Sequence, residues 1–150
     1  MPVLLVFAAL AVQANGGSDS TDIKAVMDKQ LIAWNNGDID GFMAGYWKSD
    51  KLKFVSKNGI TYGWQKVYDN YKKSYPDKAT MGTLAFEVIS IESLADDNFH
   101  SVGAPAGKNK SYMVVGKWMI SGSVKAAQGY YTLLFKKING QWVIVSDHTS

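Results

Sequence analysis

The sequence contains no cysteine, no arginine and only two histidines among its 150 residues. Without cysteine there is no disulfide, no thiolate nucleophile, no zinc ribbon and no residue for lipid attachment. A site built from several histidines also lacks its ligands within one chain, because His100 and His148 are the only imidazoles. We therefore expect neither a metal nor another cofactor.

The lack of arginine limits the possible partners. All 16 basic residues are lysines, spread from Lys24 to Lys137, and the net charge is only +3. No guanidinium group is present to bind phosphate or a guanine edge with two hydrogen bonds. Scattered lysines are typical of a solvated surface. We expect no nucleic-acid partner.

Apolar and aromatic residues are plentiful by contrast. The hydrophobic fraction of 47% is enough for one domain of this length, which buries roughly two thirds of its unfolded surface. The chain has 5 Trp and 8 Tyr, and each of these side chains combines an apolar body with one polar tip that needs a partner. Such residues suit the wall of a pocket as well as a core.

The N-terminal segment has the features of a secretory signal. Residues 3–12 are apolar, and Val12-Gln13-Ala14 fits the small-x-small rule for cleavage. The run is too short to span a bilayer. Because no basic residue precedes it, an ordinary hydrophobic N-terminal segment is the alternative. We predict a signal peptide over residues 1–14, a linker over 15–20 and a periplasmic or secreted domain over 21–150, with no membrane partner after cleavage.

Three helices are predicted in the first half of the domain. Apolar residues recur at helical spacing over residues 21–34, with Ser20 or Thr21 as N-cap, and again over residues 38–47. A third helix follows Gly63 and ends before Pro76, with an aromatic stripe along its buried face. Between the second and third helices, residues 52–56 and 60–62 predict a short hairpin.

The remainder of the chain reads as long strands over residues 83–94, 112–124, 129–138 and 142–149, with Asn139-Gly140 as a two-residue hairpin turn. In the first of these strands the apolar phase changes between Phe86 and Ile89, which predicts a β-bulge. Residues 95–110 are polar and Gly-rich and predict a long loop. This order predicts an α+β domain whose helices pack on one face of a strongly curved, mainly antiparallel sheet and enclose a pocket.

Several stretches of the sequence carry a family resemblance. They are Ala33-Trp34-Asn35-Asn36-Gly37-Asp38, Phe42-Met43-Ala44-Gly45-Tyr46-Trp47, Phe54-Val55-Ser56, Gly63-Trp64, Tyr75-Pro76-Asp77, Met81-Gly82-Thr83-Leu84 and the segment from Trp142 to Ser150. In this order they resemble the SnoaL-like proteins of domain of unknown function 4440, within the nuclear transport factor 2-like superfamily. The resemblance implies a cone-shaped, cystatin-like fold and a homodimer formed through the outer sheet face. It also implies relatives that include steroid isomerases, polyketide cyclases and dehydratases as well as non-catalytic binding modules.

Large side chains of the helices and strands are the predicted walls of the pocket, although core packing alone accounts for most of them. The predicted ligand-binding residues are Trp34, Tyr46, Trp47, Tyr62, Trp64, Tyr68, Tyr71, Trp118 and Phe135. Because stacking and apolar burial dominate such walls, we expect an apolar or aromatic small molecule as the ligand.

Asp147 and His148 are the candidate catalytic residues. In a regular strand, adjacent residues point to opposite faces, so only one of the two lines the pocket. That strand places Trp142, Ile144, Ser146 and His148 on one face and Val143, Val145, Asp147 and Thr149 on the other. An inward His148 is a general acid or base near neutral pH, whereas an inward Asp147 is a carboxylate with a raised pKa. A third possibility is that both make only structural contacts at the strand end.

Two functions follow from these residues. The first is an exported domain that binds an apolar small molecule in its aromatic-lined pocket. The alternative is a cofactor-free isomerase, cyclase or dehydratase of the steroid-isomerase type that uses Asp147 or His148 as acid or base. The second function requires an ionisable group inside the pocket, and the first requires only the pocket.

Overall fold

The computed structural model describes residues 18–94 and 110–150. The predicted signal peptide over residues 1–14 and all but one residue of the predicted loop over residues 95–110 lie outside the described residues. In the part that is described, no helix combines the length and the apolar character needed to cross a membrane.

Helix α1 (Asp19–Asn35) begins earlier than its apolar spacing predicts. Ser18 is the N-cap, and its side chain accepts a hydrogen bond from the backbone N–H of Thr21. The predicted linker over residues 15–20 therefore loses its last two residues to the helix. The buried face of α1 carries Ile23, Met27, Gln30 and Trp34, which recur at helical spacing.

Helix α2 (Ile39–Met43) is shorter than predicted. Asp38 caps it, but the chain leaves the helix before Tyr46 and runs beside the last strand instead. The backbone N–H of Trp47 donates to the carbonyl of Ile144, and the N–H of Ile144 donates to the carbonyl of Gly45. Because the chain is extended there, Tyr46 and its neighbour Trp47 point in different directions.

Helix α3 (Trp64–Ser74) matches its prediction, and the short helix α4 (Lys78–Met81) was not predicted. Asp77 caps α4 through the N–H of Thr80. Gly82 ends α4 with φ 63°, a left-handed conformation that glycine adopts without a Cβ penalty.

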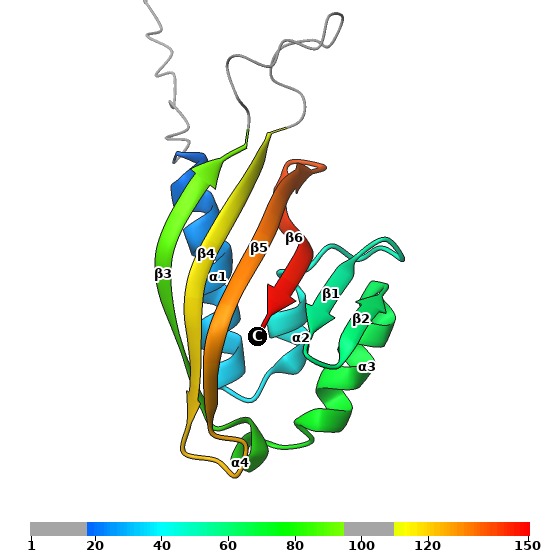
Figure 1. Ribbon diagram of the computed structural model, residues 1–150, viewed down its shortest axis with the longest axis vertical. Helices are drawn as coiled ribbons and strands as arrows, with labels where there is room; N and C mark the ends of the chain where they lie inside the picture. Colours follow the sequence, from blue (N-terminus) through cyan, green and yellow to red (C-terminus); the bar gives the residue numbers. More distant parts are fainter. Residues whose placement is uncertain (1–17, 95–109) are drawn as a thin grey trace, which may run out of the picture.

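The sheet has six strands: β1 (Lys53–Ser56), β2 (Gly59–Tyr62), β3 (Thr83–Ser93), β4 (Ser111–Ser121), β5 (Ala127–Ile138) and β6 (Gln141–Thr149). Their order is β2-β1-β6-β5-β4-β3, and every pair is antiparallel except β1 with β6. Asn139 and Gly140 both have positive φ, so the predicted two-residue turn between β5 and β6 is confirmed. Figure 1 shows the long strands curving with the helices on one side. The predicted α+β class with a curved, mainly antiparallel sheet is confirmed.

Two strands contain bulges. The predicted bulge in β3 is confirmed, because the register with β4 shifts between Val88 and Ser90 and leaves Ile89 as the extra residue. A second bulge was not predicted: Leu134 pairs with Ser146 but the next residue, Phe135, pairs with Ile144. Val145 is therefore the extra residue in β6. The face assignment of a regular strand is wrong for β6, since Trp142 and Ile144 share the inner face with Asp147.

Part of the core lies between the first half of α1 and the sheet. Large side chains there are almost fully buried: Ile23, Met27, Val114, Phe135 and Trp142. We call these five residues the packed end. Asp19 at the start of α1 accepts a hydrogen bond from the Lys110 ammonium at 2.7 Å, which joins the helix to β4 and lowers the pKa of this carboxyl.

Candidate functional site

A cavity of about 1200 Å³ lies between the sheet and the helices, away from the packed end. It reaches from the interior to a mouth formed by the β1–β2 turn, the end of α3 and the β4–β5 turn. Most of its large side chains are aromatic: Trp34, Phe42, Tyr46, Phe54, Tyr71, Tyr75, Phe86, Trp118 and Tyr131. Such walls favour a ligand with a flat, apolar body.

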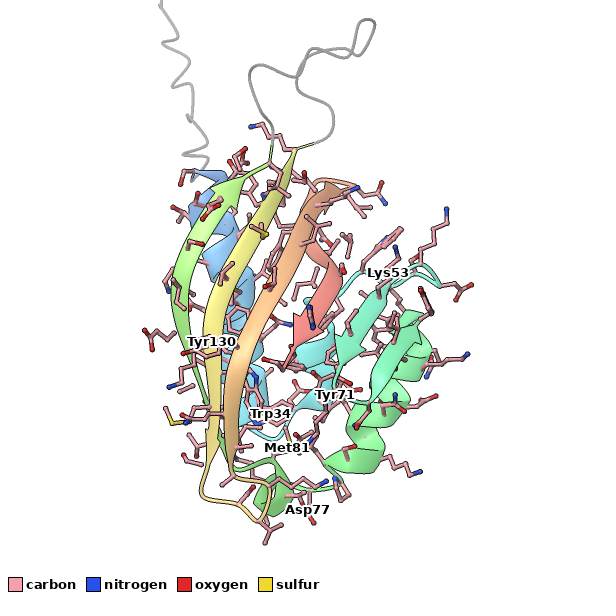
Figure 2. All side chains as sticks on the ribbon, in the orientation of Figure 1. Trp34, Lys53, Tyr71, Asp77, Met81 and Tyr130 are labelled. Atoms are coloured by element: carbon pink, nitrogen blue, oxygen red, sulfur yellow. The ribbon has the colours of Figure 1, made fainter. Side chains whose placement is uncertain are left out.

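Tyr71 stands at the centre of the aromatic contacts. Its ring centroid lies 5.3 Å from that of Phe42, 5.9 Å from that of Phe54 and 6.1 Å from that of Trp34, in edge-to-face geometry. Figure 2 labels Trp34 and Tyr71 in this region. The Trp34 Nε1–H donates to the carbonyl of Met81 at 3.1 Å, so the indole is held in one orientation. These contacts make one wall of the cavity rigid.

Asp147 supplies the ionisable group of the cavity wall. Its side chain is only 3% exposed. The Tyr46 hydroxyl donates to Oδ2 at 2.7 Å and the Thr149 hydroxyl donates to Oδ1 at 2.5 Å. Burial raises the pKa of Asp147 to about 6, against the opposing effect of these two hydrogen bonds. The carboxyl group therefore changes protonation state close to neutral pH.

Three tyrosines surround this carboxyl group. Burial is the main cause that raises the pKa of Tyr46 and of Tyr71, and the nearby Asp147 carboxylate adds to it. The same two causes raise the pKa of Tyr131 to about 12. All three hydroxyls therefore stay protonated at physiological pH and act as hydrogen-bond donors.

Gln30 is a polar lining residue that the sequence reading missed. It is 2% exposed, and its Nε2 donates to the carbonyl of Phe42 at 3.1 Å. Its amide oxygen remains as an acceptor at the cavity wall. Helical spacing could have placed Gln30 on the buried face of α1, because it lies on the same stripe as Ile23, Met27 and Trp34.

The strand resolves the alternative between the two candidate acid/base residues. Asp147 points into the cavity, and His148 is exposed on the outer face of the sheet. The alternative that places His148 in the pocket is therefore wrong, because the bulge at Val145 changes which residues of β6 face inward. A catalytic role for Asp147 stays a prediction.

Of the predicted wall residues, Trp34, Tyr46, Tyr71 and Trp118 line the cavity. Phe135 does not, because it is fully buried in the packed end. Trp47 is half-buried and also lies outside the cavity, since it follows Tyr46 in an extended segment. The sequence reading also missed Phe42, Phe54, Phe86 and Tyr131 as wall residues, although each belongs to an apolar or aromatic strand or helix pattern.

The aromatic stripe of α3 divides between two surfaces. Tyr71 and Tyr75 line the cavity, whereas Trp64 and Tyr68 lie outside it and stack on each other at a centroid distance of 5.1 Å. The Trp64 Nε1–H donates to the carbonyl of Met43 at 3.1 Å, so this indole joins α3 to α2. Predicting Trp64 and Tyr68 as pocket residues was wrong because the stripe is wider than the cavity.

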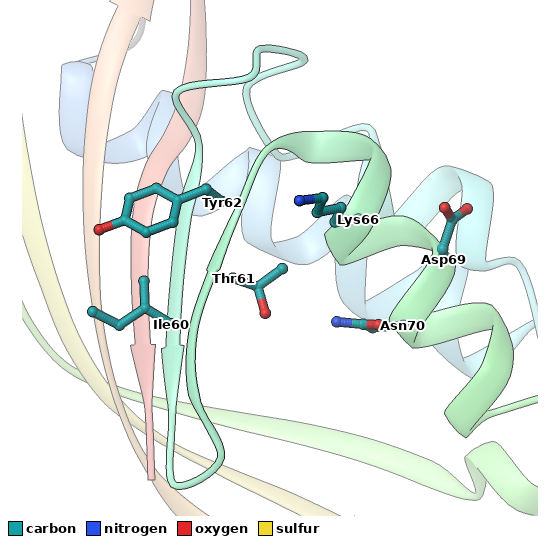
Figure 3. A pocket seen from close by; sticks show the side chains of 6 residues that line it. All are labelled: Ile60, Thr61, Tyr62, Lys66, Asp69 and Asn70. Carbon is teal, nitrogen blue, oxygen red and sulfur yellow. The ribbon is translucent and has the colours of Figure 1, made fainter.

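The prediction of Tyr62 as a pocket residue is also wrong. It is 53% exposed on the edge strand β2. Figure 3 shows Tyr62 and Ile60 on the opposite side of β2 from Thr61, which points towards α3. Thr61 also lines the cavity, whereas Tyr62 lines a separate surface pocket with Lys66 and Asp69.

Comparison with known structures gives a relative that shows the family of this chain. No family model and no curated protein matches the chain. An NTF-2 like protein of unknown function from Shewanella oneidensis MR-1 is 36% identical, with 87% of this chain and 98% of that chain covered and a TM-score of 0.75.

Two further structures support the fold alone. A domain of unknown function with a cystatin-like fold from Nostoc punctiforme PCC 73102 is 16% identical over 90% of this chain and 78% of that chain, with a TM-score of 0.62. An NTF2-like protein of unknown function from Pseudomonas putida KT2440 is 16% identical over 90% and 89% of the two chains, with a TM-score of 0.57.

Proposed function

Because the chain belongs to the nuclear transport factor 2-like superfamily and its cone encloses an aromatic cavity, we propose that it binds an apolar or aromatic small molecule. The observation that carries this proposal is the ring of aromatic side chains around a space of about 1200 Å³. Each 100 Å² of apolar surface that the ligand buries contributes about 2.5 kcal/mol. The SnoaL-like proteins are a smaller family within this superfamily, and membership of that family stays a prediction from sequence resemblance.

The polar groups of the wall add a requirement for the ligand. The Tyr71 hydroxyl and the Gln30 amide oxygen offer one donor and one acceptor among the aromatic rings of the wall. A neutral oxygen on the ligand, such as a carbonyl or hydroxyl, matches the Tyr71 donor. The proposed ligand is therefore a flat compound with a polar substituent at its inner end.

Binding is tested with N-phenyl-1-naphthylamine, an uncharged probe whose fluorescence rises in apolar surroundings. We expect Phe86→Ala to weaken its binding about three- to tenfold, because the ring lines the cavity. Tyr62→Ala is the matched control, since it removes an aromatic ring outside the cavity. Equal affinities for the two variants, or no binding by the unaltered protein, contradict the proposal.

Asp147 favours a second candidate function, cofactor-free proton transfer. Each carboxylate oxygen accepts one hydrogen bond from the protein and retains a lone pair for a proton. A pKa of about 6 allows the carboxylate to take a proton from a carbon beside a carbonyl group and to return it to another carbon. The Tyr71 hydroxyl stabilises the intermediate enolate oxygen by donating a hydrogen bond. The net reaction is an isomerisation that consumes nothing else.

Cyclohex-3-enone is a simple probe of this activity, because its conjugated isomer absorbs in the ultraviolet. We expect conversion above pH 6 that falls at least 100-fold in Asp147→Asn and persists in His148→Gln. Conversion that survives Asp147→Asn excludes the carboxylate as the base. If the unaltered protein binds the first probe but converts nothing, binding alone remains.

We also propose a homodimer formed through the outer sheet face. Tyr130, labelled in Figure 2, projects from that face and is 59% exposed, and Met119 on β4 is 44% exposed. Ile60 adds an exposed apolar side chain on β2, in the register row of Val55 and His148. Covering such a surface favours a two-fold partner. Light scattering is expected to give twice the chain mass, and Tyr130→Lys to lower it to one chain mass.

Export remains a proposal based on residues 3–14. Mass spectrometry of the protein from its native cell is expected to find a chain that begins at Asn15. An intact Met1 contradicts cleavage after Ala14.

A further inference from the structure

Three lysines meet at the mouth of the cavity, and each comes from a different segment. Lys57 belongs to the β1–β2 turn, Lys73 to the last turn of α3 and Lys125 to the β4–β5 turn. These segments are far apart in the sequence, and the fold brings them around one opening. We call Lys57, Lys73 and Lys125 the rim lysines.

The charged side chains at the mouth are all lysines. The acidic side chain among the residues that line the cavity is Asp147, which is buried in its wall. Within residues 18–94 and 110–150, the ion pairs involve Lys24, Lys72, Lys110 and Lys137, and none of the rim lysines. The positive charges at the mouth are therefore not neutralised by neighbouring carboxylates in the described part of the chain.

One rim lysine is held in place by an aromatic ring. The Lys125 Nζ lies 5.5 Å from the centroid of Tyr75, across the mouth from the turn that carries it. Tyr75 in turn packs edge-to-face on Trp34 at 4.8 Å. This cation–π contact directs the ammonium group of Lys125 to the opening and not away into solvent.

We infer that the ligand is an amphipathic organic anion, and this inference rests on the proposed binding function. Its flat apolar body lies in the cavity and its one anionic group lies at the rim lysines. The opposite orientation brings the anionic group to the Asp147 carboxyl, where like charges repel. Lysine is a compact point charge and suits a single carboxylate or sulfonate. Charge at both ends of the cavity thus sets the direction in which the ligand enters.

Two fluorescent probes of nearly the same shape test this inference. 8-Anilinonaphthalene-1-sulfonate carries the ring system of N-phenyl-1-naphthylamine together with one anionic group. We expect the sulfonate to bind about tenfold more tightly than the uncharged probe at low ionic strength, and this advantage to disappear in about 1 M salt.

Substitution of the rim lysines assigns the effect to the mouth. The triple variant Lys57→Gln, Lys73→Gln, Lys125→Gln is expected to bind the sulfonate about tenfold more weakly and the uncharged probe unchanged. The control variant Lys29→Gln, Lys51→Gln, Lys66→Gln removes the same charge from exposed lysines outside the cavity and is expected to change neither affinity. Thermal denaturation verifies that both triple variants fold.

The outcomes separate the two proposals. Equal affinity for the two probes, or equal losses in the two triple variants, overturns the inference while the binding function stands. Failure of the uncharged probe to bind overturns the binding function itself. If the rim triple variant does not fold, Lys73→Gln alone carries the test, with an expected twofold loss for the sulfonate, and no loss overturns the inference.

Discussion

The packed end and the cavity share strands β4 and β5 but differ in what lies opposite them. At the packed end, Val114 and Phe135 are completely buried and belong to one hydrophobic cluster with Ile23 and Met27 of α1. Further along the same strands, Trp118 and Tyr131 face the cavity. One sheet surface therefore serves both as core and as cavity wall, and the element opposite decides which.

This difference also accounts for the residue types. Fully buried sites favour side chains without polar atoms, because a buried polar group needs a partner. Trp142 is the exception at the packed end, since its Nε1–H is buried without a hydrogen-bond partner among the described residues. Around the cavity the polar tips have such partners or face the open space: Tyr46 donates to Asp147, and Trp34 donates to Met81. The packed end thus contributes mainly to stability, whereas the cavity wall holds aromatic rings and polar groups beside an open space.

The largest expected effect separates the two regions by stability. Phe135→Ala is expected to lower the free energy of unfolding by about 3–5 kcal/mol, because a large cavity opens in a packed core. Phe86→Ala, at the half-buried cavity wall, is expected to cost roughly half as much. Chemical denaturation measures both values. Equal losses of stability in the two variants contradict the claim that the packed end is more tightly packed than the cavity wall.

The next effect concerns the buried carboxyl group. Its pKa is raised from 3.8 to about 6 in the folded state, so the folded protein holds its proton more tightly than the unfolded chain. Stability from this group is fully present below about pH 4 and is lost as the pH rises through 6, a loss of about 3 kcal/mol. Asp147→Asn is expected to be more stable than the unaltered protein at pH 8 and to lack this pH dependence.

Denaturation curves between pH 4 and pH 8 provide the measurement for Asp147→Asn. His148→Gln is the control, because this neighbour is exposed and is expected to leave the pH dependence in place. A pH profile that is the same in Asp147→Asn and the unaltered protein disproves the raised pKa.

Tyr46→Phe tests the hydrogen bond that holds the carboxylate. Removing the hydroxyl leaves Oδ2 of Asp147 without its donor at 2.7 Å, and the expected loss is about 1–3 kcal/mol at pH 8. The loss should shrink at pH 4, where the group is neutral. A loss independent of pH assigns Tyr46 to packing alone.

Tyr71→Phe has the smallest expected effect on stability, below about 1 kcal/mol, because the hydroxyl that it removes neighbours that of Tyr46, which keeps its own hydrogen bond to Asp147. Binding of N-phenyl-1-naphthylamine is nevertheless expected to change. A large drop in melting temperature with unchanged probe binding shows that Tyr71 stabilises the core and does not contact the ligand.

Local patterns predicted the elements well. Hydrophobic spacing and turn residues located three helices and all six strands, and the phase change between Phe86 and Ile89 located the bulge in β3. The short helix α4 escaped because its four residues carry no periodicity of their own.

The site was predicted less well, because it depends on non-local geometry. No change in the alternation of apolar and polar residues marks the bulge at Val145. All residues from Trp142 to Val145 are apolar, so the sequence there shows no alternation. The early end of α2 arises from pairing between Gly45 and Ile144, about 100 residues apart. Likewise, nothing local distinguishes the face of Tyr71 from that of Tyr68 on α3.

The central position of β6 has a consequence for biosynthesis. β6 lies between β1 and β5, and the hairpin β1–β2 has no other neighbour in the sheet. During translation this hairpin emerges well before β6, and it cannot join the rest of the sheet until residue 149 or so has left the ribosome. Until then two strand edges stay open to pairing with other chains. Asp147, on this last strand, reaches its tyrosine partner only in the final step.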